Sequence, residues 1–194
     1  MSLSFGNIIL WRHAQAHDGI NTSNKNSNKN SDENSDLSRA LTYKGQRQAK
    51  NMARWLTQHL ITSNLINKSL LNQPESSNLR VVSSVALRAY QTAQALQTNL
   101  GARCNIAVYQ GFNPNSPLQK VLAELNRLDQ TANLVLIGHA PWIGQLAAHL
   151  LGIKTGEFTI KKSAIWWLRL SESTPGHYEI LTVQTPILLS EFVS

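Results

Sequence analysis

Residues 8–14 read IILWRHA, a short apolar run that ends in an arginine and a histidine. Two later stretches, VVSSVALRA at residues 81–89 and LVLIGHA at residues 134–140, also lead from apolar residues to a cation or an imidazole. Each stretch predicts a short buried strand that ends abruptly. Ligands of open α/β sheets bind beyond the carboxyl ends of the strands. We therefore expect one anion-binding pocket, in which an imidazole nucleophile would break a phosphoester or phosphoramidate bond, built from Arg12, His13, Arg88 and His139.

The apolar pattern predicts strands that alternate with helices along the chain. Strands are expected over residues 7–12, 79–83, 106–109 and 134–137, with a final hairpin from 164–170 and 178–183. Helices are expected from about 42 through 60, over 85–100 and 117–128, and from the turn after 140 to 151. This alternation predicts the α/β class, as a three-layer α/β/α sandwich on a mostly parallel, mixed sheet.

Four motifs follow one another in a familiar order: RHA at residues 12–14, RALTYKG at 39–45, Ser84 through Thr92, and Gly138-His139. In this order and spacing the chain resembles the histidine phosphatases, also called the phosphoglycerate mutase-like superfamily. Within that superfamily it is most similar to the small phosphohistidine phosphatases of the SixA type. The resemblance implies the same sandwich with one antiparallel strand, and it implies neither a metal nor an organic cofactor.

The resemblance also implies roles for the pocket residues. His13 stands at the position of the family's nucleophile, so phosphoryl transfer would pass through a phosphohistidine intermediate. Arg12 and Arg88 would clamp the phosphoryl oxygens, because a guanidinium group forms paired hydrogen bonds with phosphate and keeps its charge. His139 would bind the phosphoryl oxygens opposite His13. Attack by a neutral imidazole requires a partner that fixes its tautomer, and the sequence does not identify that partner.

Two further residues are weaker candidates for substrate binding. Ser84 is most simply the N-cap of the helix that carries Arg88, although the amides beside it could also hold an anion. Arg39 belongs to a family motif near the pocket, where the neighbouring Thr42 is equally well explained as a helix cap.

The sequence departs from the family in two places. Ala14 stands where many members carry glycine, which is a small change. Members that act on small phosphoesters commonly place a glutamate after the third strand, and residues 109–112, YQGF, contain no carboxyl group. A leaving alkoxide needs a proton more than a leaving imidazole does, so this absence favours a phosphohistidine substrate. Glu124 or Asp18 could supply the proton from elsewhere.

Composition excludes several classes of protein. Although the net charge is +7, the basic residues are scattered, with one adjacent pair at Lys161-Lys162, so we expect no nucleic-acid partner. The apolar stretch 134–153 contains His139, Pro141 and other polar groups that are costly in lipid, which argues against a membrane span. Cys104 is the single cysteine, and the N-terminus has no signal pattern, so we expect a cytoplasmic protein. A metal pair of His13 and His17 is not favoured, because that spacing needs a helix.

We expect one histidine phosphatase domain over residues 1–194. Its least apolar segment, residues 21–36, predicts a mobile polar loop at the mouth of the pocket, either a substrate-selecting lid or an insertion without a role. A second patch rich in asparagine and serine covers 63–78 and links a helix to the second strand.

Three functions fit these features. The first is a phosphatase that removes phosphate from phosphohistidine in a signalling protein, such as a histidine-containing phosphotransfer domain. The second is a phosphomonoesterase of small phosphorylated metabolites. The third is a module that binds a phosphorylated partner without hydrolysing it, and an intact histidine at the nucleophile position argues against this one.

Overall fold

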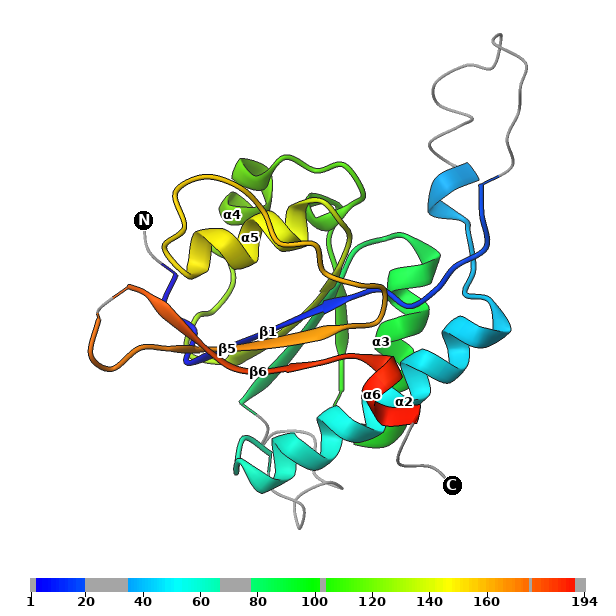
Figure 1. Ribbon diagram of the computed structural model, residues 1–194, viewed down its shortest axis with the longest axis horizontal. Helices are drawn as coiled ribbons and strands as arrows, with labels where there is room; N and C mark the ends of the chain where they lie inside the picture. The colour runs from blue at the N-terminus through cyan, green and yellow to red at the C-terminus, as the bar shows by residue number, and fades with distance from the viewer. Residues whose placement is uncertain (1–2, 20–34, 67–77, 102–103, 175, 191–194) are drawn as a thin grey trace, which may run out of the picture.

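A six-stranded sheet forms the centre of the protein in the computed structural model, which describes residues 3–19, 35–66, 78–101, 104–174 and 176–190 (Figure 1). The strands are β1 (Asn7–Arg12), β2 (Leu79–Ser83), β3 (Ile106–Val108), β4 (Asn133–Gly138), β5 (Ile165–Leu170) and β6 (Tyr178–Gln184). The helices are α2 (Tyr43–Thr62), α3 (Leu87–Leu100), α4 (Leu118–Leu125), α5 (Trp142–Leu150) and α6 (Pro186–Ser190), with a 3-10 turn, η3 (Gln110–Phe112). The predicted order of strands and helices is confirmed.

The sheet is mixed, with the strand order β3-β2-β4-β1-β5-β6. β1, β2, β3 and β4 pair in parallel, whereas β5 runs antiparallel to both of its neighbours. The single antiparallel strand agrees with the expectation from the family resemblance. The three strands that lead to the sequence motifs, β1, β2 and β4, are adjacent in the sheet. Their carboxyl ends therefore meet at one edge, where Arg12 is the register partner of Gly138.

Helices cover both faces of the sheet, which confirms the three-layer sandwich (Figure 1). On one face, α4 and α5 pack over the strands in a core that includes Phe112 and Trp142. On the other face, α2 and α3 pack together over a second core that includes Met52 and Leu96. Every residue of the central β4 is buried, as expected for a parallel strand with both faces covered.

The beginnings of two helices test the predicted caps. Thr42 is the N-cap of α2, where its side-chain oxygen accepts a hydrogen bond from the Gly45 amide at 3.0 Å, as predicted. The prediction that Ser84 is the N-cap of α3 is wrong. α3 begins two residues later than expected, after Ala86, whose side chain makes no cap. The Ser84 hydroxyl is instead 2.6 Å from the His139 imidazole.

Other differences concern the ends of elements. α4 ends at Leu125, three residues before the predicted end, and the short α6 was not predicted. The β5–β6 hairpin is confirmed, and within it Trp167 is buried while Trp166 is half-buried, in line with the alternation of a strand. The predicted loop at 21–36 and the patch at 63–78 lie largely outside the described residues. Residues 35–37, however, form a helical turn.

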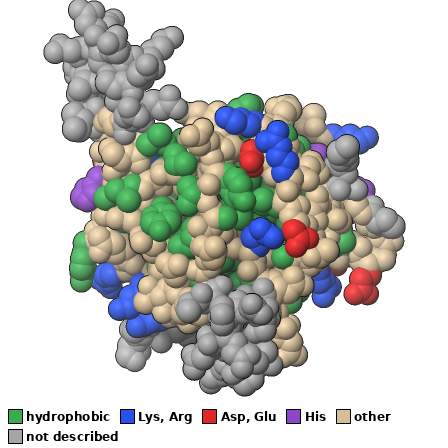
Figure 2. All heavy atoms as spheres, turned by 180° about the vertical axis from the view of Figure 1, so that it is seen from behind, with side chains coloured by type: hydrophobic (Ala, Val, Ile, Leu, Met, Phe, Trp, Pro, Cys, Tyr) green, Lys and Arg blue, Asp and Glu red, His purple; other side chains and the backbone are tan. Residues whose placement is uncertain are grey.

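Two further expectations concern the distribution of basic side chains on the surface and the absence of a membrane span. On the face seen in Figure 2, Lys and Arg side chains lie at several separate places, with acidic side chains among them, in keeping with the scattered basic residues of the sequence. Within the described part of the chain, no helix is both long and apolar enough to cross a membrane.

Candidate active site

His13 lies directly after β1, at the carboxyl edge of the sheet, and is 7% exposed. Its backbone amide donates to the Gly138 carbonyl oxygen at 3.0 Å, which ties the turn after β1 to the end of β4. The His13 Nδ1 atom is 2.7 Å from the Ala14 carbonyl oxygen. Because a carbonyl oxygen only accepts hydrogen bonds, this contact places the proton on Nδ1 and leaves the Nε2 lone pair available. This is the tautomer-fixing partner that the sequence did not reveal.

The surroundings of His13 keep its imidazole neutral. Burial, together with the positive charges of Arg88, Arg12 and Lys162, lowers the pKa of His13 to about 3, against the opposing effect of the Ala14 hydrogen bond. A neutral imidazole is the nucleophilic form, so the ring is ready to attack over the whole physiological pH range.

Arg12 and Arg88 reach the same cavity from different elements. Arg12 ends β1, and its Nη1 atom donates to the Ile160 carbonyl oxygen at 2.6 Å. Arg88 lies in the first turn of α3 and is 2% exposed. Burial lowers the pKa of both guanidinium groups below the ordinary value. The Nε atoms of both side chains are buried without a hydrogen-bond partner among the described residues.

His139 follows β4 and lies opposite His13, with 5.0 Å between the ring centroids. Its Nε2 atom is 2.6 Å from the Ser84 hydroxyl, and its Nδ1 atom is buried without a partner in the described part of the chain. Burial, followed by the closeness of the His13 ring and the charges of the nearby arginines, lowers the pKa of His139 well below its ordinary value. His139 is therefore a neutral imidazole at physiological pH.

Ser84 and Gly138 support His139. Ser84 is fully buried and does not line the cavity; since its hydroxyl contacts the His139 ring, we interpret it as a positioning residue. Gly138 is required for packing, because a Cβ atom there would collide with the indole ring of Trp142. That indole is buried against Phe112 and faces the His139 ring at a centroid distance of 6.4 Å. Trp142 thus packs against His139 without lining the cavity.

These side chains line one small cavity of about 230 Å³. Its walls include all four residues that the sequence predicted for the pocket, together with Ala16, Asp36, Arg39, Pro114, Asn115, Ala140 and Lys162. Four of the lining side chains are permanent cations, and Asp36 is the single carboxylate among them. With three buried nitrogen atoms around it that lack partners among the described residues, the cavity is suited to a small, highly charged anion such as a phosphoryl group.

Asp36 is the lining residue that sequence reasoning missed. One carboxylate oxygen accepts from Arg88 Nη2 at 2.8 Å, and the other accepts from Arg39 Nε and Nη2 at 2.9 and 2.6 Å. Arg88 Nη1 also donates to the Asp36 main-chain oxygen at 2.6 Å. Burial alone would raise the pKa of Asp36, but the hydrogen bonds and charges of the two arginines outweigh it and hold the pKa below its ordinary value.

The two carboxylates named from the sequence are placed elsewhere. Glu124 lies on α4, where it contacts Arg127 and fills the space beside Gly111. Asp18 is exposed, and neither residue lines the cavity. Among the described residues, no group of three or more His, Cys, Asp or Glu side chains is arranged to hold a metal ion.

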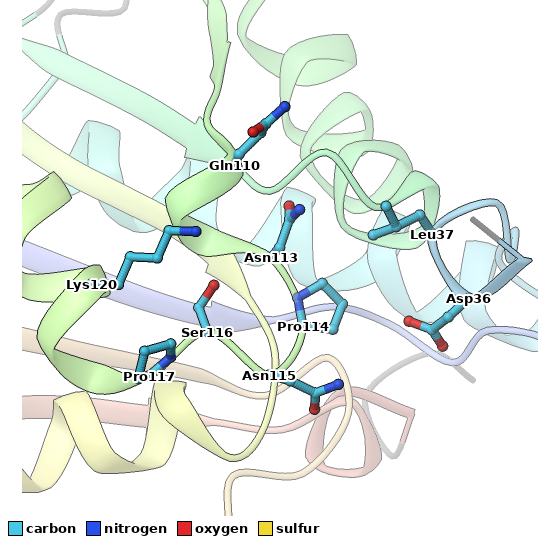
Figure 3. A pocket seen from close by; sticks show the side chains of 9 residues that line it. All are labelled: Asp36, Leu37, Gln110, Asn113, Pro114, Asn115, Ser116, Pro117 and Lys120. Carbon is cyan, nitrogen blue, oxygen red and sulfur yellow. The ribbon is translucent and has the colours of Figure 1, made fainter. Parts of the chain in front are cut away.

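A larger cavity of about 640 Å³ adjoins this one (Figure 3). Its walls come from the turn around Asp36, from the segment between β3 and α4 and from the first turn of α4. Besides Asp36, the lining residues are Leu37, Gln110, Asn113, Pro114, Asn115, Ser116, Pro117 and Lys120. Most of these side chains are polar, and they carry hydrogen-bond donors and acceptors rather than a second cluster of cations. The sequence did not predict this cavity.

Comparisons with known proteins agree with this architecture. The chain is 34% identical, over 135 residues, to an uncharacterized protein of Picosynechococcus sp. PCC 7002, covering 68% of this chain and 72% of that one. The two chains therefore belong to the same family. No protein-family model matches the chain.

Two solved structures show the fold. The protein histidine phosphatase SixA, complexed with tungstate, is similar with a TM-score of 0.66 and 24% identity, covering 94% of this chain and 99% of that one. A phosphoserine phosphatase mutant of Entamoeba histolytica, in complex with phosphoserine, is similar with a TM-score of 0.57 and 15% identity, covering 93% of this chain and 97% of that one.

Proposed function

The chain has the fold of the histidine phosphatase superfamily, and we propose that it is a metal-independent phosphatase that forms a phosphohistidine intermediate on His13. One observation carries this proposal: a neutral His13, with Nδ1 held by the Ala14 carbonyl oxygen, lines a cavity with Arg12, Arg88 and His139. A site that only binds phosphate needs the cations but does not need a nucleophile with a fixed tautomer.

The reaction proceeds in two steps. His13 Nε2 attacks phosphorus, the bond from phosphorus to the leaving group breaks, and its electron pair departs with the leaving group. Water then attacks the phosphohistidine, the N–P bond breaks, and its electron pair returns to Nε2. Arg12 and Arg88 stabilise the charge on the phosphoryl oxygens in both steps, since guanidinium donors fixed in a buried site need no reorganisation.

For the substrate we propose a phosphohistidine side chain in a signalling protein, such as a histidine-containing phosphotransfer domain. Two points support it. The segment after β3, now seen as η3, carries no carboxyl group, and imidazole leaves more readily than an alkoxide. A structurally similar protein is the protein histidine phosphatase SixA. The cations around the site would attract such an acidic phosphorylated partner.

A second candidate substrate is a small phosphomonoester. The larger cavity beside the phosphoryl site favours it, because a volume of about 640 Å³ lies within the range of small-molecule sites. The phosphoserine phosphatase among the similar structures also acts on a small phosphorylated compound.

Phosphate release in EDTA tests the function. The wild type and His13→Ala would be compared on a phosphorylated histidine-containing phosphotransfer domain and on p-nitrophenyl phosphate. We expect the wild type to be active without metal and the variant to lose about 10⁴-fold or more in kcat. His177→Ala, which removes an exposed histidine, is the matched control and should retain activity.

The substrate pattern separates the alternatives. Strong preference for the phosphoprotein supports a protein phosphohistidine phosphatase, whereas activity confined to small esters supports a metabolite phosphatase. Binding of the phosphoprotein without turnover of either substrate would contradict the catalytic proposal and support a binding module. Trapping of labelled phosphate on the wild type, but not on His13→Ala, identifies the intermediate.

A further inference from the structure

Asp36 stands at the boundary between the two cavities of the candidate site. Three residues line both the phosphoryl cavity and the larger cavity: Asp36, Pro114 and Asn115. Of these three, only Asp36 has an ionisable side chain. Figure 3 shows it across the larger cavity from Lys120, with its carboxylate at the end of the turn that carries Leu37.

The position of this boundary matters for the chemistry. The cation-rich cavity is the one that fits a phosphoryl group. The larger cavity adjoins it and is large enough to hold the leaving group of a substrate. With phosphorus beside His13 and the leaving group in the larger cavity, the bond that breaks lies between the two. A carboxyl group at that boundary is therefore next to the leaving-group oxygen.

The contacts of Asp36 fix the carboxylate there. Arg39 holds one of its oxygens through two donors, while Arg88 holds the other through one. A phosphoryl group that takes over Arg88 Nη2 leaves this second oxygen free but still oriented by Arg39. The incoming negative charge also raises the pKa of the neighbouring carboxylate from the lowered value that the two arginines give it, which favours the protonated form that a proton donor requires.

We propose that Asp36 is the catalytic acid and base of this site, and that the protein therefore also hydrolyses phosphomonoesters of small, polar alcohols. This inference rests on the proposed phosphatase function. As His13 Nε2 attacks phosphorus, the P–O bond breaks and the leaving oxygen takes the proton of the Asp36 carboxyl group. When water attacks the phosphohistidine, its proton passes to the Asp36 carboxylate and restores the acid.

The walls of the larger cavity select the class of alcohol. Gln110, Ser116 and Lys120 have side chains that make no hydrogen bond or ion pair with another described residue. They offer an amide, a hydroxyl and an ammonium group to a ligand, and most of the side chains that line the cavity are polar. A leaving group with several hydroxyl groups matches these partners better than an aromatic or aliphatic one.

Leaving-group dependence tests the role of Asp36. Asp36→Asn keeps the size and one acceptor oxygen of the side chain but cannot donate the carboxyl proton. Asp18→Asn, the same substitution at an exposed aspartate outside both cavities, is the control. Both variants and the wild type would be assayed on p-nitrophenyl phosphate, whose leaving group needs no proton, and on glycerol phosphate, whose alkoxide does.

We expect Asp36→Asn to lose about 10²- to 10⁴-fold in kcat/KM on glycerol phosphate and to change little in kcat/KM on p-nitrophenyl phosphate, because kcat/KM covers only the steps up to departure of the leaving group and leaves out the later attack of water. Equal losses on both substrates would show that Asp36 only positions Arg88, and increased activity would show that it blocks the site; either result overturns the proposal. Wild-type activity on p-nitrophenyl phosphate alone would also overturn it while leaving the phosphatase function intact. If the wild type is inactive on every substrate, the phosphatase function itself fails.

Discussion

The candidate pocket has a floor and a rim that differ in origin. The floor consists of Arg12, His13, Arg88 and His139, which follow three adjacent parallel strands or begin the helix after one of them. The rim consists of Asp36, Arg39, Asn115 and Lys162, which lie on connecting segments and are more exposed. The strands of the sheet and the first turn of α3 fix the floor, whereas a short helical turn, loops and side-chain contacts hold the rim. Phosphoryl transfer to His13 should therefore depend on the floor for every substrate, whereas protonation of the leaving group and the choice and approach of the substrate should depend on the rim.

After the loss of His13, the largest effect common to all substrates should come from the floor at Arg88. Arg88→Ala removes a buried guanidinium group from the phosphoryl cavity and should lower kcat/KM by about 10²- to 10³-fold on every substrate. Arg88→Lys should restore only part of this loss, because an ammonium group cannot make the paired hydrogen bonds. Steady-state kinetics on p-nitrophenyl phosphate measure both variants.

The exposed Arg127, which follows α4 and does not line the cavity, provides the control for Arg88. Arg127→Ala removes the same charge outside the cavity and should leave kcat/KM within about two-fold of the wild type. A comparable loss in both variants would mean that the net charge of the protein, and not the floor, governs the reaction.

The next prediction concerns stability and tests how tightly the residues behind the floor are packed. Gly138→Ala introduces a methyl group into the space of the Trp142 indole, and the resulting strain should lower the free energy of unfolding by about 1–3 kcal/mol. Gly6→Ala is the control, since a Cβ atom there would meet only Asn133 Oδ1, at an ordinary 3.5 Å. Urea unfolding measures both variants. Equal stability of the two would contradict the tight packing of Trp142 behind His139.

Much of the floor could be predicted from the sequence, because buried parallel strands leave a strong apolar pattern and end at a common edge. The rim could not. Asp36 lies in a polar segment without periodicity, and its one local signal was an acidic residue three positions before Arg39, a spacing that brings two side chains together on a helical turn. Ser84 was misjudged for a related reason: its preference for caps was visible, but its contact with His139, 55 residues away, was not. The catalytic roles of Arg12, His13, Arg88 and His139, and the single domain over residues 1–194, stay predictions.

The pH dependence of the free energy of unfolding provides a further test of the floor, through the buried His13. In the folded protein the pKa of His13 is about 3, mainly because of burial, against an ordinary value of 6.5. Between these values the unfolded chain binds more protons than the folded one, so the free energy of unfolding should fall as the pH is lowered through 6.5 toward 3. His13→Asn should show a shallower fall in urea unfolding between pH 7 and pH 4.5, pH values chosen on either side of the unfolded-state titration at roughly 6.5.

The exposed His177 serves as the control for this dependence. His177→Asn should reproduce the wild-type fall in stability, since its side chain is not enclosed in the cavity. If His13→Asn keeps the full wild-type slope, then the pKa of His13 is not lowered in the folded protein, and the buried environment that keeps the nucleophile neutral is contradicted.

The smallest effect should come from the rim at Lys162. This exposed lysine lines the phosphoryl cavity from the segment before β5, and its neighbour Lys161 does not. Lys162→Ala should lower kcat/KM by about two- to five-fold at low salt, through weaker attraction of the anionic substrate, and the difference should shrink at high ionic strength. Lys161→Ala makes the same change in net charge one residue away and should have less effect. A loss in Lys162→Ala as large as that in Arg88→Ala, and independent of salt, would place Lys162 in the floor and remove the distinction between the two regions.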